Sequence, residues 1–324
     1  MKDKVIIGID GGASKTIGII FNDKGHTLAY DYCLGTNLSI DEKRSSERVV
    51  KLIKRLLEKS NLSISDISSL GIGLAGASNE TGRQALFGLL DNIRLSSKAI
   101  ITNDVEPVYD FMWSGSQQGI LVNVGTGVIC MAKKNNKFIK VAGQGHDSGD
   151  IGSGYWIAKE ALIEVELYNS AMNSDIKEIL LSSLEHYQID SFASLMQKIN
   201  DSDEKIATIA SFARKVILLA SEGNECARSI VQQATRIVAE YIIEVRDTLE
   251  YGKNEIIVAG NGSVLRNSYF RSELNNALSF DFKDIKWVFL DISPAYAVGT
   301  LSGRIHKINI DRKRLNSNAL KVKE

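Results

Sequence analysis

The chain has 324 residues, of which 44% are hydrophobic, and its 39 basic side chains balance its 39 acidic ones. The length and apolar content are enough for two hydrophobic cores, while the zero net charge and the lack of a basic cluster argue against a nucleic-acid partner. No apolar run is long enough to span a bilayer, and the three cysteines are too widely spaced for a disulfide framework or a metal cluster, so we expect a cytoplasmic protein without a membrane partner.

The first expected element is an apolar strand over residues 5–9, which ends at Asp10 and a turn of small residues, 11–14. Strands over 16–21 and 26–31 follow. Backbone N–H groups in such a turn can approach a phosphate closely, because no bulky side chain stands in the way. A carboxylate at a strand end can also hold hydrated Mg²⁺. Asp-Gly and Gly-Gly are equally common in ordinary hairpins, so phosphate binding and a plain hairpin both stay open.

The next elements alternate between helix and strand. They are a helix over 42–60, a strand over 69–74, a helix over 81–92 and a strand over 98–102. This order is typical of an α/β sheet with parallel and antiparallel members. The last strand leads into Asp104, just before a helix expected to begin near Glu106. Asp104 could cap that helix or act as a general base, and the sequence alone leaves both roles open.

A second segment repeats the plan of the first about 115 residues later. A strand over 120–124 ends in the turn Gly125-Thr126-Gly127, and strands over 128–132 and 138–141 follow. The chain either contains a duplicated domain, whose two glycine turns form a phosphate clamp, or holds two unrelated hairpins.

The rest of the chain is mainly helical. We expect a helical region over 155–251, strands over 255–259 and 287–290, a glycine turn over 260–263, and a helix over 295–305 that is rich in small residues. That helix could pack closely against a sheet or cross back to the first domain. We expect residues 1–118 to form an N-terminal domain, joined by the C-terminal helix 295–324, and residues 119–294 to form a C-terminal domain.

Residues 143–156 hold five glycines in fourteen positions. Such density favours a backbone wrapped around a ligand, or tight turns before a helix. We expect that helix to begin near Ser153, with its positive end available to an anion or a polar ligand. His146 and Asp150 could share a metal ion, but a hydrogen-bonding role is favoured because no further His or Cys lies near them.

The motifs DGGASKT, ITND, VNVGTG, GHDSGDIGSGYW and VAGNGSV, in this order and spacing, resemble the N-acetylglucosamine kinase branch of the sugar kinase/actin-like ATPase superfamily. That branch also contains the BadF/BadG-type ATPases, and the resemblance covers roughly residues 4–305. It implies an α/β, two-domain actin-like ATPase (ribonuclease H-like) fold with a duplicated βββαβα core and an interdomain cleft. It also implies ATP and Mg²⁺ as cofactors, and a homodimer.

The resemblance further implies roles for single residues. Asp10 would hold the metal, and Asp104 would be the catalytic base. ATP would be bound by residues of the glycine turns and one residue near the adenine: Gly11, Gly12, Ala13, Ser14, Lys15, Thr126, Gly127, Ser211, Gly262 and Ser263. The sugar would contact Asn37, Asp104, Gly143, Gln144, Gly145 and Asp150. Gln144 stands where the family usually has an aromatic residue, and Ile151 where it usually has an acidic one.

The implied function is an ATP-dependent kinase that phosphorylates the 6-hydroxyl of an N-acetylated amino sugar, with N-acetylglucosamine ahead of N-acetylmuramate and glucosamine. An alternative is an ATPase that activates a 2-hydroxyacyl-CoA dehydratase-type enzyme. Such an activator needs two closely spaced cysteines per chain to share an iron–sulfur cluster, and Cys33, Cys130 and Cys226 are far apart in the sequence. A third hypothesis is a non-catalytic sugar sensor on a kinase fold.

Overall fold

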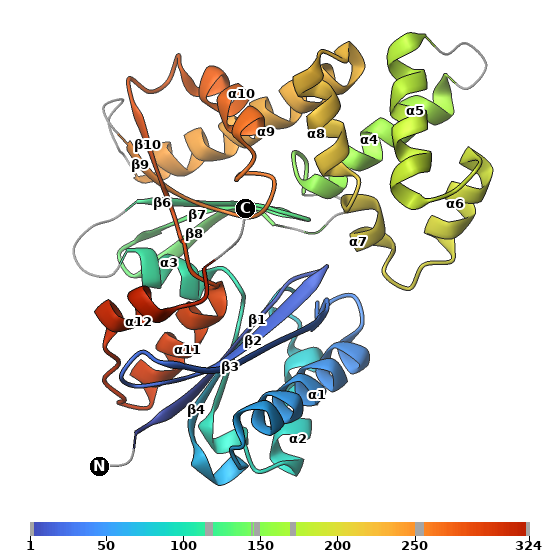
Figure 1. Ribbon diagram of the computed structural model, residues 1–324. Coiled ribbons are helices and arrows are strands. Elements are labelled where there is room, and N and C mark those ends of the chain that lie inside the picture. The colour runs from blue at the N-terminus through green and yellow to red at the C-terminus, as the bar shows by residue number, and fades with distance from the viewer. Residues whose placement is uncertain are drawn as a thin grey trace. The chain divides into compact units, whose positions relative to one another are not determined.

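The computed structural model describes residues 3–113, 119–143, 145, 150–168, 173–249 and 256–321 (Figure 1). The chain forms two compact units. Residues 1–117 and 290–323 make the N-terminal unit, and residues 118–289 make the C-terminal unit. The sequence predicts domain boundaries after residues 118 and 294. That the two parts fold independently as domains remains a prediction.

The N-terminal unit is built on one five-stranded mixed sheet. Its strands are β1 (Val5–Gly11), β2 (Lys15–Asn22), β3 (Thr27–Leu34), β4 (Ile67–Leu74) and β5 (Ala99–Thr102), in the order β3-β2-β1-β4-β5. β1 pairs antiparallel with β2 and parallel with β4, and β4 pairs parallel with β5. The carboxyl ends of β1, β4 and β5 therefore meet at one edge of the sheet, where open α/β sheets bind their ligands.

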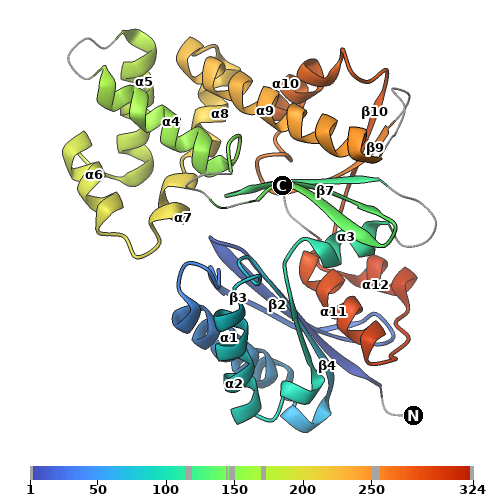
Figure 2. The same ribbon diagram turned by 180° about the vertical axis from the view of Figure 1, so that it is seen from behind.

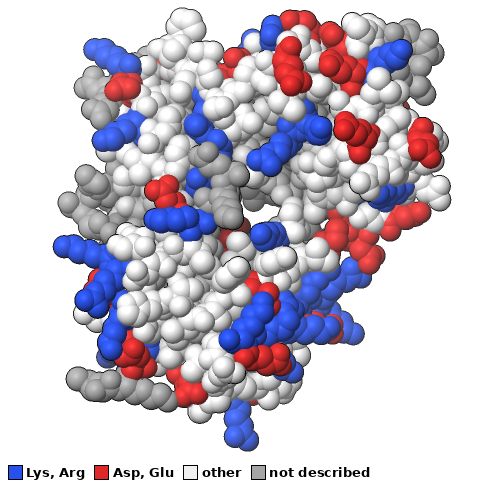
Figure 3. Space-filling model, in the orientation of Figure 1, with Lys and Arg blue, Asp and Glu red and all other residues white. Residues whose placement is uncertain are grey.

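Helices cover both faces of this sheet (Figures 1 and 2). α1 (Glu42–Ser60) packs on β2 and β3 with α2 (Glu80–Asn92) beside it, and the short 3₁₀ helices η1 (Ile64–Asp66) and η2 (Ser96–Lys98) precede β4 and β5. α1 buries Leu52, Ile53 and Leu56 in the core. Figure 3 shows basic side chains gathered over the region of α1, with acidic side chains among them.

The opposite face of the sheet carries α11 (Pro294–Ile305), with α3 (Glu106–Met112) against it and α12 (Arg312–Asn318) following in the chain. α11 lies directly on β1 because Gly8 has no side chain: a Cβ there would lie 1.9 Å from the carbonyl oxygen of Ala295. Gly299 contributes to the same close approach. The expectation that this small-residue helix packs closely on a sheet is confirmed.

The C-terminal unit repeats the same sheet. Its strands are β6 (Ile120–Val124), β7 (Val128–Lys134), β8 (Lys137–Ala142), β9 (Ile256–Asn261) and β10 (Ile285–Phe289), in the order β10-β9-β6-β7-β8. β6 pairs antiparallel with β7 and parallel with β9, as β1 does with β2 and β4. The equal connectivity of the two sheets confirms the α/β class and the duplicated core, and so removes the hypothesis of two unrelated hairpins.

The helical region expected over 155–251 consists, in its described part, of six helices. They are α4 (Gly154–Leu167), α5 (Ser174–Tyr187), α6 (Phe192–Asn200), α7 (Lys205–Ala210), α8 (Ala213–Glu222) and α9 (Glu225–Leu249). α5 and α8 end in left-handed residues, Gln188 and Gly223. α9 packs on β6, β7 and β8, and α10 (Ser268–Leu278) packs on α9. Within the described ranges, none of the helices is both long and apolar enough to cross a membrane.

Candidate active site

Asp10 and Asp104 lie at the same edge of the N-terminal sheet. Asp10 pairs with Gly73 of β4, and Gly73 pairs with Thr102, the last residue of β5. A Cβ at Gly73 would lie 3.1 Å from the carbonyl oxygen of Asn103, so the missing side chain lets the loop after β5 approach β4. The parallel strands thus bring the two expected carboxylates together.

Asn103, and not Asp104, satisfies the first N–H groups of α3. Its Oδ1 accepts hydrogen bonds from the backbone N–H of Val105 at 3.1 Å and of Glu106 at 2.7 Å. The N-cap position itself is Val105, whose side chain makes no cap. The first two N–H groups of this turn are thus satisfied by Asn103, and the role of Asp104 remains a prediction. An Asn three residues before Glu106 was the available signal for this cap.

The electrostatics of the two carboxylates are coupled. Burial, and then the negative charge of Asp104, raise the pKa of Asp10 to about 8. A divalent cation would favour the ionised form of both groups, and carboxylate oxygens are ligands that Mg²⁺ prefers. Within the described residues no cluster of three or more His, Cys, Asp or Glu side chains could hold a metal by itself. Mg²⁺ bound with a nucleotide takes phosphate and water ligands as well, so one or two carboxylates suffice, and these residues fit that ion.

The turn between β1 and β2 is a hairpin, and the segment after β3 packs against it and forms a hydrogen bond with it. The backbone N–H of Gly12 donates to the carbonyl of Lys15 at 3.0 Å, and the N–H of Thr36 donates to the carbonyl of Gly12 at 3.0 Å. Gly35 lies so close that a Cβ there would be 1.9 Å from the carbonyl oxygen of Ala13. The side chains of Ser14 and Lys15 are exposed. The hairpin is confirmed, and phosphate binding by its small residues 11–15 remains a prediction.

Asn37 is fixed next to this edge by the turn that follows β4. Its Oδ1 accepts the backbone N–H of Ser39 at 2.9 Å. A Cβ at Gly76 would lie 2.3 Å from the same oxygen, so only glycine allows this contact. The N–H of Ala75 donates to the carbonyl of Gly11 at 2.8 Å, which ties the turn to the end of β1. The Nδ2 group of Asn37 has no partner among the described residues and is a donor available to a ligand.

In the C-terminal unit, the turn 125–127 is bound to the start of α4. The N–H of Gly154 donates to the carbonyl of Gly125 at 2.8 Å, and the N–H of Tyr155 donates to the carbonyl of Thr126 at 3.1 Å. Ser153 caps the helix by accepting the N–H of Trp156 at 3.2 Å. The expected start of this helix is confirmed. Its first N–H groups hold the turn, and the expectation that the positive end of this helix is available to an anion or a polar ligand remains a prediction.

Two further segments meet this turn. Gly262, after β9, has φ 90°, and a Cβ there would lie 2.2 Å from the carbonyl oxygen of Val124. A Cβ at Gly127 would lie 2.7 Å from Oδ2 of Asp150. Burial, with the charge of Asp150, raises the pKa of Tyr241 on α9, so Asp150 also lies near that ring. The structure therefore brings Thr126, Gly127, Asp150 and Gly262 together.

The remaining expected residues of this unit are placed as follows. Gly143 and Gly145 follow β8 with φ 73° and 100°, while Gln144 and His146 lie outside the described residues, so the His146–Asp150 metal hypothesis stays untested. Ser263 is exposed just after Gly262.

Ser211 lies at the end of α7. Its Oγ donates to the carbonyl of Thr208 at 2.6 Å and is hydrogen-bonded to Nε2 of His186 at 2.8 Å. His186 comes from α5, 25 residues earlier in the chain, and no local pattern indicated that contact.

The chain is similar over most of its length to two proteins that are described as amino sugar kinases. The chain is 27% identical over 304 residues to an N-acetylmuramic acid/N-acetylglucosamine kinase of Clostridium acetobutylicum, with 90% of this chain and 96% of that protein covered. It is 22% identical over 317 residues to an N-acetyl-D-glucosamine kinase of Dictyostelium discoideum, covering 93% of this chain and 98% of that one.

A solved structure from Chromobacterium violaceum, provisionally described as an N-acetylglucosamine kinase, superimposes with a TM-score of 0.70 at 20% identity and covers 92% of this chain and 99% of its own. This likeness confirms the predicted actin-like ATPase fold. Residues 7–298 match the profile of the BadF/BadG/BcrA/BcrD ATPase family. Because that match spans most of the 324 residues, the chain belongs to the BadF/BadG/BcrA/BcrD ATPase family.

Proposed function

We propose that this chain is an ATP-dependent kinase that phosphorylates the 6-hydroxyl of an N-acetylated amino sugar, with N-acetylglucosamine and N-acetylmuramate as the first candidates. The observation that carries the proposal is the pair Asp10 and Asp104 at one sheet edge, where the charge of Asp104 adds to burial in raising the pKa of Asp10. Membership of an ATPase family implies ATP use, and the names of two relatives support an amino sugar as the acceptor.

Asp104 would accept the proton of the sugar hydroxyl as that oxygen attacks the γ-phosphorus of ATP. The bond between the γ-phosphorus and the β,γ-bridging oxygen breaks, and ADP leaves. Asp10 would hold Mg²⁺, which neutralises charge on the phosphates when it is bound. The small residues of the β1–β2 turn and of the turn 125–127 would place backbone N–H groups at phosphate oxygens, because no side chain blocks their approach.

The sugar would be positioned by Asn37 and by the segment around Asp150. Asn37 has its Oδ1 engaged by Ser39, so its Nδ2 group is the part left to donate to a sugar oxygen. Asp150 would accept from a sugar hydroxyl, with Gly143, Gly145 and Gln144 completing the loop. Ser211, Gly262 and Ser263 would border the nucleoside.

The alternative of a dehydratase activator finds no support in the cysteines. All three are free and lie on separate elements, Cys33 on β3, Cys130 on β7 and Cys226 on α9. Burial raises the pKa of Cys130 far above its usual range, which disfavours the thiolate that an iron–sulfur cluster requires.

The decisive test is a phosphorylation screen of amino sugars with ATP and Mg²⁺, followed by NMR of the product to locate the phosphate. We expect transfer to the 6-oxygen of N-acetylglucosamine or N-acetylmuramate, at a rate that Asp104→Asn lowers by about 10²–10⁴-fold. ATP hydrolysis without transfer to any sugar would contradict the proposal and favour an ATPase role.

A further inference from the structure

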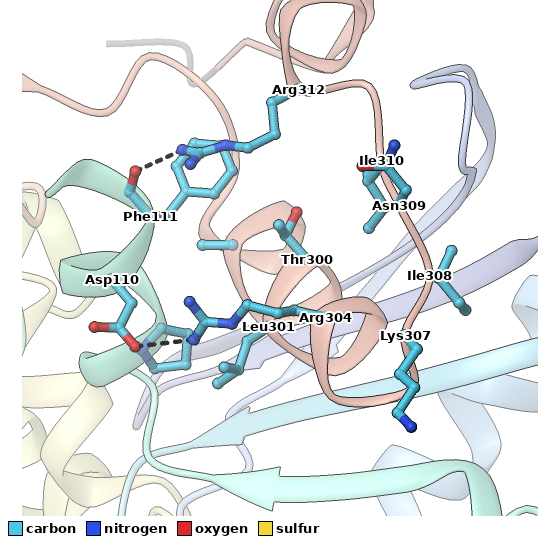
Figure 4. Close-up of a pocket in the computed structure, with 12 residues that line it drawn as sticks. Asp110, Phe111, Thr300, Leu301, Arg304, Lys307, Ile308, Asn309, Ile310 and Arg312 are labelled. Atoms are coloured by element: carbon cyan, nitrogen blue, oxygen red, sulfur yellow. Dashed lines mark hydrogen bonds and ion pairs between the residues drawn. The ribbon is translucent and has the colours of Figure 1, made fainter. Parts of the chain in front are cut away.

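A pocket of about 370 Å³ opens in the N-terminal unit between α3, α11 and the segment that joins α11 to α12 (Figure 4). Its size is within the range of small-molecule sites and exceeds what an inorganic ion needs. All its lining residues belong to this one unit, and neither Asp10 nor Asp104 is among them. The proposed active site does not account for this pocket.

The lining of the pocket carries an excess of positive charge. Arg304, Lys307 and Arg312 are the cations, and Asp110 is the one carboxylate among the lining residues, which leaves a formal charge of +2. Asp110 is engaged by Arg304, with 3.3 Å between Oδ2 and Nη2. Among the described residues, Lys307 and Arg312 have no carboxylate partner. Two charges are therefore left for an anionic ligand.

Arg312 is held in a fixed orientation before any ligand arrives. Its guanidinium carbon lies 4.2 Å from the centroid of the Phe111 ring, and its Nη2 donates to the carbonyl oxygen of Phe111 at 2.6 Å. Figure 4 shows the stacked pair at one end of the pocket. Burial, followed by the charge of Arg304, lowers the pKa of Arg312, as expected when like charges face one space. A planar guanidinium held in this way suits the oxygens of a phosphate group.

The pocket also has a polar group without a partner and an apolar wall. The Oγ1 atom of Thr300 is buried and makes no hydrogen bond within the described part of the chain, although a buried hydroxyl normally has one. Thr300 projects from α11 into the space beside Arg312 (Figure 4). Leu301, Ile308 and Ile310 supply apolar surface. Cations, a donor hydroxyl and apolar carbon together suit an organic phosphate better than a free ion.

We propose that this pocket is a second ligand site, which binds a phosphomonoester of hexose size. The phosphate group would lie against Arg312 and Lys307, and the sugar carbons would cover the apolar wall, with a sugar oxygen or phosphate oxygen hydrogen-bonded to Thr300. This site is separate from the proposed kinase site and does not depend on it.

The test is isothermal titration calorimetry of the full chain with glucose 6-phosphate, with inorganic phosphate and glucose as separate arms. We expect binding of glucose 6-phosphate that is at least about tenfold tighter than that of either part alone, because both halves of the pocket then contribute. Equal affinity for inorganic phosphate would overturn the assignment to an organic ester, and absence of glucose 6-phosphate binding would overturn the site.

Two variant pairs locate the binding. Lys307→Gln should weaken glucose 6-phosphate binding about tenfold, as for loss of a charge-assisted hydrogen bond. Lys313→Gln removes the same charge from an exposed residue outside the pocket and should leave the Kd unchanged. Thr300→Val should also weaken binding, while Thr300→Ser should retain it. The Thr300 hydroxyl has no partner to lose, so Thr300→Val should keep the melting temperature of the parent. If Lys307→Gln and Thr300→Val both bind like the parent, the ligand lies elsewhere.

Discussion

Asp104 faces Asp10 across the edge of one sheet, and its negative charge adds to burial in raising the pKa of Asp10 to about 8. An aspartate with an unfolded pKa of about 3.9 and a higher folded pKa destabilises the fold increasingly as the pH rises between those two values. Near neutral pH the pair therefore lowers the stability of the metal-free protein. This loss of stability is expected for two carboxylates that bind a cation together, because the bound cation would neutralise their repulsion.

We predict that Asp10→Asn stabilises the metal-free protein at pH 7 by at least about 1 kcal/mol, since it removes one charge of the pair. The gain should disappear below about pH 4, where the parent carboxyl is protonated in both the folded and unfolded states. The same variant should lose ATP-dependent activity through loss of the metal ligand. Urea unfolding between about pH 3 and 8 measures the first effect, and an Mg²⁺ titration of activity measures the second. An active variant with the Mg²⁺ dependence of the parent would remove Asp10 from the metal site.

Asp104→Asn should lower turnover by about 10²–10⁴-fold, the range for loss of a general base, and leave nucleotide binding nearly intact. Its stability should stay close to that of the parent, because Asn103 caps α3. The matched variant Asn103→Ala should instead cost about 1 kcal/mol of stability, the usual value of a lost cap. Steady-state kinetics and denaturant unfolding of both variants separate the roles. Near-normal turnover in Asp104→Asn would mean that this carboxylate is not the base.

Sequence reasoning succeeded where one local pattern decides the structure. The helix expected over 42–60 begins and ends at Glu42 and Ser60, because Asp41 caps its start and Asn61 takes a left-handed conformation after its end. The meeting of Asp10 and Asp104 could be predicted because the carboxyl ends of parallel strands share one sheet edge.

Sequence reasoning was incomplete for three features of the structure. The helix α10 was missed, although Asn267 caps it with two hydrogen bonds to backbone N–H groups. Asp104 was considered as a possible cap of α3 and Asn103 was not, although both are good capping residues and Asn103 accepts the N–H groups of Val105 and Glu106. The hydrogen bond between His186 and Ser211 joins two helices, so no periodicity in the sequence reports it.

Asp31 on β3 provides a test of the N-terminal unit alone. Its carboxylate accepts from Nε of Arg55 at 2.6 Å and pairs with Nζ of Lys59 at 2.9 Å, both on α1. Burial alone would raise its pKa, but these partners and a backbone hydrogen bond outweigh burial and lower it to about 2. A carboxylate with a lowered folded pKa stabilises the fold above its unfolded pKa and loses that contribution as the pH falls through the folded pKa.

We therefore predict that Asp31→Asn costs about 1–2 kcal/mol of unfolding free energy at pH 7, and that this difference shrinks as the pH falls from about 4 towards 2. Asp190→Asn is the control, because Asp190 is exposed and has no partner in the described part of the chain. Its effect should stay within about 0.5 kcal/mol at every pH. Urea unfolding across this pH range makes the comparison. If the difference in unfolding free energy between Asp31→Asn and the parent stays constant down to pH 2, the substitution acts through side-chain packing and not through the lost charge.

Asn37 allows the sugar and nucleotide roles to be separated, because its two amide atoms have different partners. Oδ1 accepts the N–H of Ser39, while Nδ2 is the donor left for a ligand. Asn37→Asp keeps an oxygen for Ser39 and replaces only the donor, so the loop should remain folded. We predict that this change raises the KM for the amino sugar by roughly tenfold or more, since a carboxylate cannot donate to a sugar oxygen, and leaves the KM for ATP within about twofold.

Asn37→Ala, which also removes the oxygen, should raise the sugar KM similarly and in addition lower the melting temperature. Measuring both KM values at saturating co-substrate is sufficient. A sugar KM equal to that of the parent in Asn37→Asp would show that the amide only shapes the loop, and a raised ATP KM alone would move Asn37 to the nucleotide.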